Sequence, residues 1–258
     1  MYQSLIPIIS NHEVMPGVHL IWLDAPEIAA SVRPGQFVMV SCDSGQDRLL
    51  RRPLSIHRAR PQSLAVLFAA VGAGTDWLSR RPAEEKIDLL GPLGNGFSLQ
   101  PHARRLLLVA GGMGIAPLAF LAQEALKKDY SVKLLAGART ASHIIPEQLV
   151  PEGTDIIRAT EDGSTGEAGM VTDLIPRYAE SADQVCLCGP LPMLKAVANK
   201  YHSYLAGKTV QASLEVRMGC GLGFCYACTI RTGQGLKQVC KDGPVFDFNE
   251  VIWEELSS

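Results

Sequence analysis

The sequence predicts a multidomain protein with a β-rich N-terminal unit, an α/β unit built on a parallel sheet, and a small cysteine-rich C-terminal module. Three observations lead to this prediction. The first hundred or so residues hold several short runs typical of strands, with turn residues between them. From about residue 102, apolar strand candidates alternate with helical segments. Four of the seven cysteines lie after residue 219.

Length and charge narrow the class of protein. At about 100–200 residues per domain, 258 residues suit two domains and a small third module. A net charge of −2 provides no basic face for nucleic acid, so we expect no nucleic-acid partner. The longest uncharged run, 106–123, is broken by glycines and a proline, and the N-terminus lacks a signal-peptide pattern. We therefore expect a cytoplasmic protein with no membrane span.

The first unit, residues 1–100, is expected to be a small closed barrel or a sandwich. Strands are predicted at 18–23, 36–40, 54–57 and 64–68. Turn residues separate them, as at Arg33-Pro34-Gly35 and Asp43-Ser44-Gly45. Many short strands at this spacing are typical of those two architectures.

Two motifs in this unit point to a phosphate-bearing ligand. Arg51-Arg52-Pro53-Leu54-Ser55 stands at the entrance of one strand, and an arginine can bind a pyrophosphate through two hydrogen bonds. Gly74-Thr75 is expected to be the N-cap of a short helix, whose first turn favours negative charge. A salt-bridged turn would explain the first motif equally well, so the prediction depends on the two together.

The second unit, residues 101–210, predicts a parallel sheet with right-handed crossovers. Strands are expected at 105–110, 132–136, 155–159 and 184–188, and helices at 117–128 and 170–178. The first strand is almost wholly apolar, as a strand buried on both faces requires. Ligands of such sheets bind at the carboxyl ends of the strands.

A glycine loop follows the first strand of this sheet. Gly111, Gly112 and Gly114 would let a phosphorylated ligand approach the backbone, and the following helix N-terminus favours its charge. Pro117 stands where the third glycine of G-x-G-x-x-G would be, and a plain strand–turn–helix connection would show the same residues. The loop by itself is a weak signal.

Other strand ends strengthen the prediction of a nucleotide site. Residues 160–164 and the triplet Cys188, Gly189 and Pro190 follow predicted strands, and we expect them on the same edge of the sheet. Cys188 is either a ligand contact or a packed small residue. Arg139 could contact a 2′-phosphate or be a solvated surface charge, which leaves NAD and NADP open.

The C-terminal module, residues 211–258, carries the most specific pattern. Cys220, Cys225 and Cys228 form C-x4-C-x2-C, and eleven residues separate Cys228 from Cys240. This is the plant-type [2Fe–2S] spacing, and glycines in the loop would let N–H groups point at sulfur. A four-cysteine zinc site is the alternative, although such sites usually pair two short knuckles and here three cysteines share one loop.

The order R-P-L-S, G-T, G-G-x-G-I-A-P and C-G-P resembles the ferredoxin–NADP reductase superfamily. With C-x4-C-x2-C-x11-C and the closing C-K-D-G-P-V-F, the chain resembles the electron-transfer subunits of class 1B dihydroorotate dehydrogenase over essentially its full length. The resemblance implies an antiparallel, flavin-binding β-barrel at 1–100, an NAD-binding α/β domain at 101–210 and an iron–sulfur module at 211–258.

The resemblance also implies a set of site residues and no catalytic residue for dihydroorotate in this chain. FAD would contact Arg52, Pro53, Leu54, Ser55, Leu67, Phe68 and Ala69, with Gly74 and Thr75 at its pyrophosphate. NAD would contact Gly111, Gly112, Gly114, Cys188, Gly189 and Pro190, and the cluster would be held by Cys220, Cys225, Cys228 and Cys240.

The implied partner is an FMN-containing catalytic subunit that oxidises dihydroorotate in pyrimidine biosynthesis, in a heterotetramer with two of each chain. We expect electrons to pass from FMN through the cluster to FAD and then to NAD⁺, because a flavin can exchange electrons singly or in pairs. Two alternatives remain: a reductase subunit of the same superfamily serving a hydrogenase, sulfite reductase or ferredoxin-coupled complex, and a non-enzymatic binding module stabilised by zinc.

Overall fold

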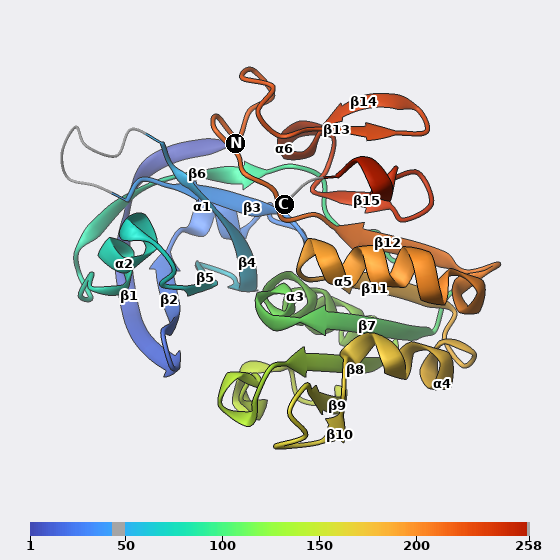
Figure 1. Ribbon diagram of the computed structural model, residues 1–258. Coiled ribbons are helices and arrows are strands. Elements are labelled where there is room, and N and C mark those ends of the chain that lie inside the picture. The colour runs from blue at the N-terminus through green and yellow to red at the C-terminus, as the bar shows by residue number, and fades with distance from the viewer. Residues whose placement is uncertain (43–49, 257–258) are drawn as a thin grey trace.

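The structure is a computed structural model that describes residues 1–42 and 50–256. The predicted turn at Asp43-Ser44-Gly45 lies outside the described residues. Figure 1 shows a barrel coloured blue to teal, a sheet with helices coloured green to orange, and an orange-to-red C-terminal segment that lies along both.

The N-terminal unit is a closed six-stranded antiparallel barrel, which confirms the barrel and excludes the sandwich. Its order is β1-β2-β5-β4-β3-β6. The strands are β1 (Tyr2–Met15), β2 (Val18–Asp24), β3 (Phe37–Val40), β4 (Arg52–Arg60), β5 (Ser63–Ala69) and β6 (Lys86–Leu93), with the helices α1 (Pro26–Ala29) and α2 (Ala73–Ser79) between them. Ile21, Ile56 and Val66 are completely buried in its core.

The second unit is a seven-stranded sheet in the order β10-β9-β8-β7-β11-β12-β15. The strands are β7 (Arg105–Gly111), β8 (Ser131–Ala138), β9 (Asp155–Thr160), β10 (Glu167–Ala168), β11 (Gln184–Cys188), β12 (Thr209–Ser213) and β15 (Val245–Asp247). Its helices are α3 (Ile115–Leu126), α4 (Ile175–Ala179) and α5 (Leu191–Ala196). All neighbouring pairs are parallel except β12 and β15, so an antiparallel edge strand completes the predicted parallel sheet.

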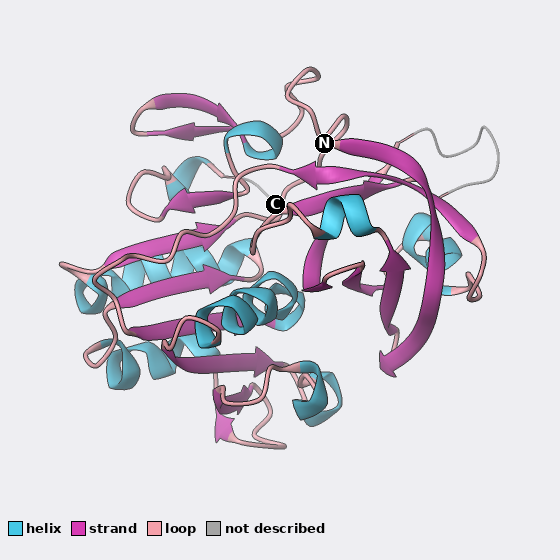
Figure 2. Ribbon diagram, turned by 180° about the vertical axis from the view of Figure 1, so that it is seen from behind, coloured by secondary structure: helices cyan, strands magenta, loops and turns pink. Residues whose placement is uncertain are grey.

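Burial explains why β7 is apolar along nearly its whole length. Leu107 and Val109 pack with α4 and α5 on one face, and Leu106 and Leu108 pack with α3 on the other. Figure 1 shows α4 and α5 in front of the sheet, and Figure 2 shows α3 on the opposite face. The predicted helix at 170–178 is only partly right, because a 3-10 turn (Val171–Leu174) comes first and α4 begins just before a proline.

The C-terminal segment is joined to both larger units. It contains β13 (Thr229–Thr232), β14 (Gly235–Gln238) and α6 (Val239–Asp242), and then supplies β15 to the large sheet. On the barrel side, the side-chain amide of Asn95 donates to the carbonyl oxygens of Lys241 and Asp242 at 3.1 and 3.0 Å. Among the described residues, no helix is long and apolar enough to span a membrane.

Candidate functional site

The loop 219–228 is shaped so that backbone N–H groups point at Cys220. The N–H groups of Leu222 and Phe224 both lie 3.3 Å from Cys220 Sγ. Gly221 and Gly223 adopt the left-handed conformation, with φ of +74° and +85°, which strains other residues. The loop therefore presents backbone N–H donors to the Cys220 thiolate. The glycines in the sequence predicted such donors.

The other three cysteines complete the group. The N–H of Gly223 lies 3.2 Å from Cys240 Sγ, and the N–H of Cys240 lies 3.4 Å from Cys228 Sγ. Cys228 and Cys240 are buried, whereas Cys225 is exposed. The four sulfurs thus form a site with a buried side and one edge open to solvent.

The cysteine thiols influence one another's ionisation. Burial alone would raise the pKa of Cys220, but N–H donors from Leu222, Cys225 and Phe224 outweigh it and lower the pKa to about 6. Burial, followed by the neighbouring Cys228, raises the pKa of Cys240 to about 12. Crowded thiols that cannot all ionise by themselves fit a positively charged centre, which holds its ligands as thiolates.

Within residues 1–42 and 50–256, no group of three or more His, Cys, Asp or Glu side chains is placed so that it could hold a metal ion. In a [2Fe–2S] cluster the four thiolates are divided between two irons.

On the barrel, the structure brings the Arg52 strand and the α2 turn together. A Cβ added to Gly74 would lie 2.8 Å from Arg52 Nε, so the guanidinium group crosses the start of α2. The prediction that Gly74-Thr75 is the N-cap is wrong. The N-cap is Gly72, and Thr75 lies in the first turn, where its hydroxyl accepts the N–H groups of Val71 and Gly72. A side chain three residues into the helix can reach back to N–H groups at or before the N-cap, which the sequence pattern did not reveal.

The two predicted flavin-contacting strands lie at the same end of the barrel. Ile56 of β4 pairs with Val66 of β5 in antiparallel register, so residues 52–55 and 67–69 extend beyond that pair in the same direction. The Phe68 ring also stacks on His19 of β2, with 5.8 Å between ring centroids. His19 was not predicted, because nothing in its run distinguishes it from any other strand residue.

The glycine loop and the 188–190 turn meet where the chain leaves β7 and β11. A Cβ added to Gly114 would lie 2.1 Å from the carbonyl oxygen of Cys188, and one added to Gly111 would lie 3.0 Å from Pro190. Gly112 has a φ of +51° and open space around it. The predicted nucleotide residues are therefore neighbours at the switch point of the sheet, the usual ligand position in such folds.

Cys188 has a neighbour that the sequence did not indicate. Its thiol is completely buried and lies 3.8 Å from the Glu215 carboxylate, which follows the adjacent strand β12. Burial, and then the negative charge of Glu215, keeps the pKa of Cys188 well above its ordinary value, so the thiol stays protonated. The pair was missed because its members lie 27 positions apart in the sequence.

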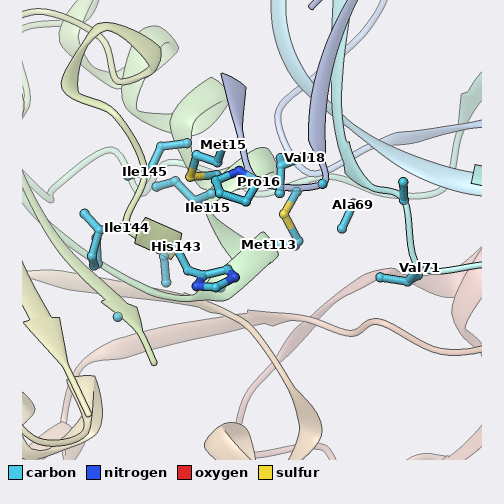
Figure 3. Close-up of a pocket in the computed structure, with 16 residues that line it drawn as sticks. Met15, Pro16, Val18, Ala69, Val71, Met113, Ile115, His143, Ile144 and Ile145 are labelled. Carbon is cyan, nitrogen blue, oxygen red and sulfur yellow. The ribbon is translucent and has the colours of Figure 1, made fainter. Parts of the chain in front are cut away.

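A cavity of about 290 Å³ lies between the barrel and the sheet (Figure 3). The last residue of β1, Met15, and the turn residue Pro16 form one wall, and His143 and Ile145 lie on the sheet side. Gly112 of the glycine loop also lines it, so the cavity opens onto the predicted nucleotide site.

Comparisons with known proteins identify the families that this chain matches. The family described as the iron–sulfur cluster binding domain of dihydroorotate dehydrogenase B matches residues 215–252, and the oxidoreductase NAD-binding domain matches residues 108–199. The dihydroorotate dehydrogenase B (NAD(+)) electron transfer subunits of Desulforamulus reducens and a Geobacillus species are 38% and 39% identical to this chain. The alignments cover 96% and 98% of this chain and 97% and 99% of those proteins.

Solved structures show the same fold. An NADH-dependent reduced ferredoxin-NADP oxidoreductase, studied for flavin-based electron bifurcation, superposes with a TM-score of 0.87 at 28% identity, covering 98% of this chain and 91% of that one. A ferredoxin NADP⁺ reductase from Neisseria gonorrhoeae, with FAD and NADP bound, gives a TM-score of 0.66 at 16% identity, over 79% and 92% of the two chains. At that identity the second likeness shows the fold alone.

Proposed function

Because the chain belongs to the family of dihydroorotate dehydrogenase B electron transfer subunits, we propose that it links an FMN-containing catalytic partner to NAD. The chain is an oxidoreductase subunit for electron transfer, with FAD, a [2Fe–2S] cluster and NAD as its cofactors. Dihydroorotate oxidation belongs to the catalytic subunit. The heterotetramer with two of each chain and the cytoplasmic location are parts of the same proposal.

One contact carries the proposal. A Cβ added to Gly221 would lie 2.7 Å from Met39 of β3, so the cysteine loop packs directly on the barrel. Met39 pairs with Pro53 of β4, which belongs to the predicted flavin-contacting strand. Only one strand therefore separates the four-cysteine site from that segment, an arrangement suited to electron exchange between the two.

We assign the cofactors to the residues that the sequence predicted. Cys220, Cys225, Cys228 and Cys240 hold the cluster, with charge offset by the loop N–H groups. Residues 52–55, 67–69 and 74–75 contact FAD, and Gly111, Gly112, Gly114, Cys188, Gly189 and Pro190 contact NAD. When bound, the cluster supplies single-electron exchange, the nicotinamide supplies hydride exchange, and the flavin can do either. The division of the chain at residues 100 and 210 remains a prediction, and β12 runs from Thr209 to Ser213 across the second boundary.

The catalytic subunit is proposed to bind at the solvent-exposed edge of the cysteine site. Phe224 and Tyr226 flank Cys225, and their exposed fractions are 78% and 70%. Large aromatic side chains are enriched at protein interfaces and are costly to leave in water. This support is independent of the comparisons.

The direct test separates the two half-reactions. The purified chain, reconstituted with FAD and cluster, is expected to reduce an artificial dye with NADH and not to oxidise dihydroorotate. Adding the catalytic subunit should give dihydroorotate-dependent reduction of NAD⁺. Turnover of dihydroorotate by the single chain would contradict the assignment.

The two alternatives give different outcomes. A chain that serves a hydrogenase, sulfite reductase or ferredoxin-coupled complex would co-purify with those partners from its host and not with an FMN protein. A zinc-stabilised binding module would lack visible absorption, whereas flavin and [2Fe–2S] absorb visible light and bleach on reduction.

A further inference from the structure

A second cavity, of about 410 Å³, lies between the barrel and the segment that leads into β9. Arg58 of β4 lines one side of it, and residues between 147 and 156 line the other. Arg58 is about 20 Å along β4 from Arg52, at the end of the strand away from the proposed flavin contacts. Thr154 precedes β9, at the edge of the parallel sheet opposite the glycine loop. The cavity is therefore separate from the proposed cofactor sites.

Arg58 brings a positive charge that no carboxylate offsets. In the part of the chain that the structure describes, its guanidinium forms no ion pair, and its Nε is buried without a hydrogen-bond partner. Its Nη2 donates to the carbonyl oxygen of Gln148 at 3.2 Å. Burial, and then the charge of Arg60, lowers the pKa of Arg58 from its ordinary value, although arginine stays charged in proteins. An anion that supplies acceptors would relieve this cost.

Thr154 gives the cavity a second polar group without a partner. Among residues 1–42 and 50–256, its buried hydroxyl makes no hydrogen bond. Buried polar groups are normally hydrogen-bonded to protein or to ordered water, and a cavity of this size is large enough for a small ligand. Because a guanidinium can only donate hydrogen bonds, the pair of groups calls for an occupant with acceptor oxygens.

Two glutamates limit which anion fits. Glu147 also lines the cavity, but Arg158 Nη2 lies 3.2 Å from its Oε2 and offsets its charge. Glu152 is exposed and has no ion-pair partner in the described chain, so its negative charge opposes a highly charged ligand. A molecule with one acidic group suits these charges better than a polyphosphate does.

We propose that this cavity binds a small organic acid whose carboxylate or phosphate group accepts hydrogen bonds from Arg58 and Thr154. The apolar part of the acid lies against Val150, Pro151 and Ile156. The ligand bridges the barrel and the sheet, because Arg58 belongs to β4 and Thr154 leads into β9. The site requires neither FAD nor NAD, so it is independent of the proposed function.

The probes are phenyl phosphate and benzoate, which carry the two kinds of acidic group on the same apolar ring, and benzamide, which carries no charge. Binding is measured by calorimetry on the purified full chain, with NAD in excess to fill the proposed nucleotide site. We expect at least one acid to bind and benzamide not to bind. The acid that binds more tightly identifies the acidic group that the site prefers.

The variants test the two polar groups. Arg58→Gln should weaken binding of the acid about ten- to hundredfold, because it removes a charge-assisted contact. Arg60→Gln is the matched control, because it removes the same charge from the same strand, but Arg60 lies over the Trp22 ring and does not line the cavity.

Thr154→Val keeps the shape of the side chain and removes only the hydroxyl. It should weaken binding of the acid about three- to tenfold. It should not lower the Tm of the chain without ligand, because the hydroxyl has no partner to lose among the described residues. This variant tests the site even if Arg58→Gln fails to fold.

Three results would overturn the inference. If neither acid binds, the cavity holds only water. Equal binding by Arg58→Gln and Arg60→Gln would place the acids elsewhere on the chain, and equal binding of benzamide and benzoate would show that no charge is recognised. Failure of NAD to bind, with binding of the acid intact, would contradict the proposed nucleotide site and leave this inference standing.

Discussion

Replacing Gly114 by alanine tests why the glycine loop needs glycine at this position. The Gly114 backbone has φ of −58° and ψ of −12°, so alanine would suffer no backbone strain there. The added Cβ would lie 2.1 Å from the carbonyl oxygen of Cys188 and 2.7 Å from the amide nitrogen of Gly189. These are main-chain atoms at the end of β11, and they cannot rotate away. Relief to an ordinary contact of 3.4 Å requires α3 and β11 to separate by about 1.3 Å.

That separation would lower the stability of the fold and disturb the proposed NAD site. Overpacking of this kind costs about 1–3 kcal/mol, and at about 2–4 °C per kcal/mol the Tm would fall by roughly 2–12 °C. Cys188 pairs with Ala110 in the sheet, so the same movement would open the β7–β11 junction at which we place NAD. An error of about 1 Å in such a site can cost about a hundredfold in rate.

The assays are thermal unfolding and NADH-dependent dye reduction by the loaded chain. Gly233→Ala is the matched control, because the nearest atom to its added Cβ is 3.9 Å away. It should change stability by less than about 0.5 kcal/mol. Equal Tm values and equal dye reduction in the two variants would refute the reasoning that close approach of α3 to β11 requires glycine.

Three further predictions concern the other sites. Cys225→Ser should remove or destabilise the cluster, seen as lost visible absorption and iron, while FAD stays bound; retained electron transfer to the catalytic subunit would contradict the ligand assignment. Arg52→Ala should weaken FAD retention by about 1.5–3 kcal/mol, measured by flavin release, whereas Arg51→Ala should not, because Arg51 pairs with Asp88. Burial, and then Arg58, lowers the pKa of His57 from 6.5 to about 3, so its contribution to stability is complete above pH 6.5 and falls as pH drops toward 3. His57→Leu should reduce this acid sensitivity by a few kcal/mol in urea unfolding at pH 4–5, and an unchanged pH profile would show that His57 is not its source.

The local pattern of apolar and polar residues predicted most of the α/β unit. β7, β8, β9 and β11 all lie within two residues of their predicted bounds, because each is an apolar run bounded by polar residues or glycine. β1 and β6 were missed. β1 buries Ile6 and Ile8 but exposes Leu5 and Ile9, so its apolar residues fall on both faces and lose the alternation that marks a half-buried strand.

The strands β12 and β15 were missed for a different reason. Each is short, and β15 lies in the cysteine-rich segment, about thirty residues beyond its partner β12. Nothing local in Val245–Asp247 marks it as the edge of the large sheet. Its position depends on the course of the intervening loop, which sequence periodicity does not describe.

The cysteine spacing, the glycines and the alternating apolar runs by themselves predicted the order of the units, a four-cysteine metal or cluster site, and phosphate-bearing ligands. The assignment of FAD and NAD came from the family resemblance. These features are local, because ligand spacing and strand periodicity act over a few residues. Only the tertiary structure placed the Gly221 loop on Met39, Glu215 beside Cys188 and Asp162 beside the end of β8. Each of these contacts joins residues that are far apart in the chain or on separate strands, so it exists only once packing of the sheet and barrel has fixed their backbones in space.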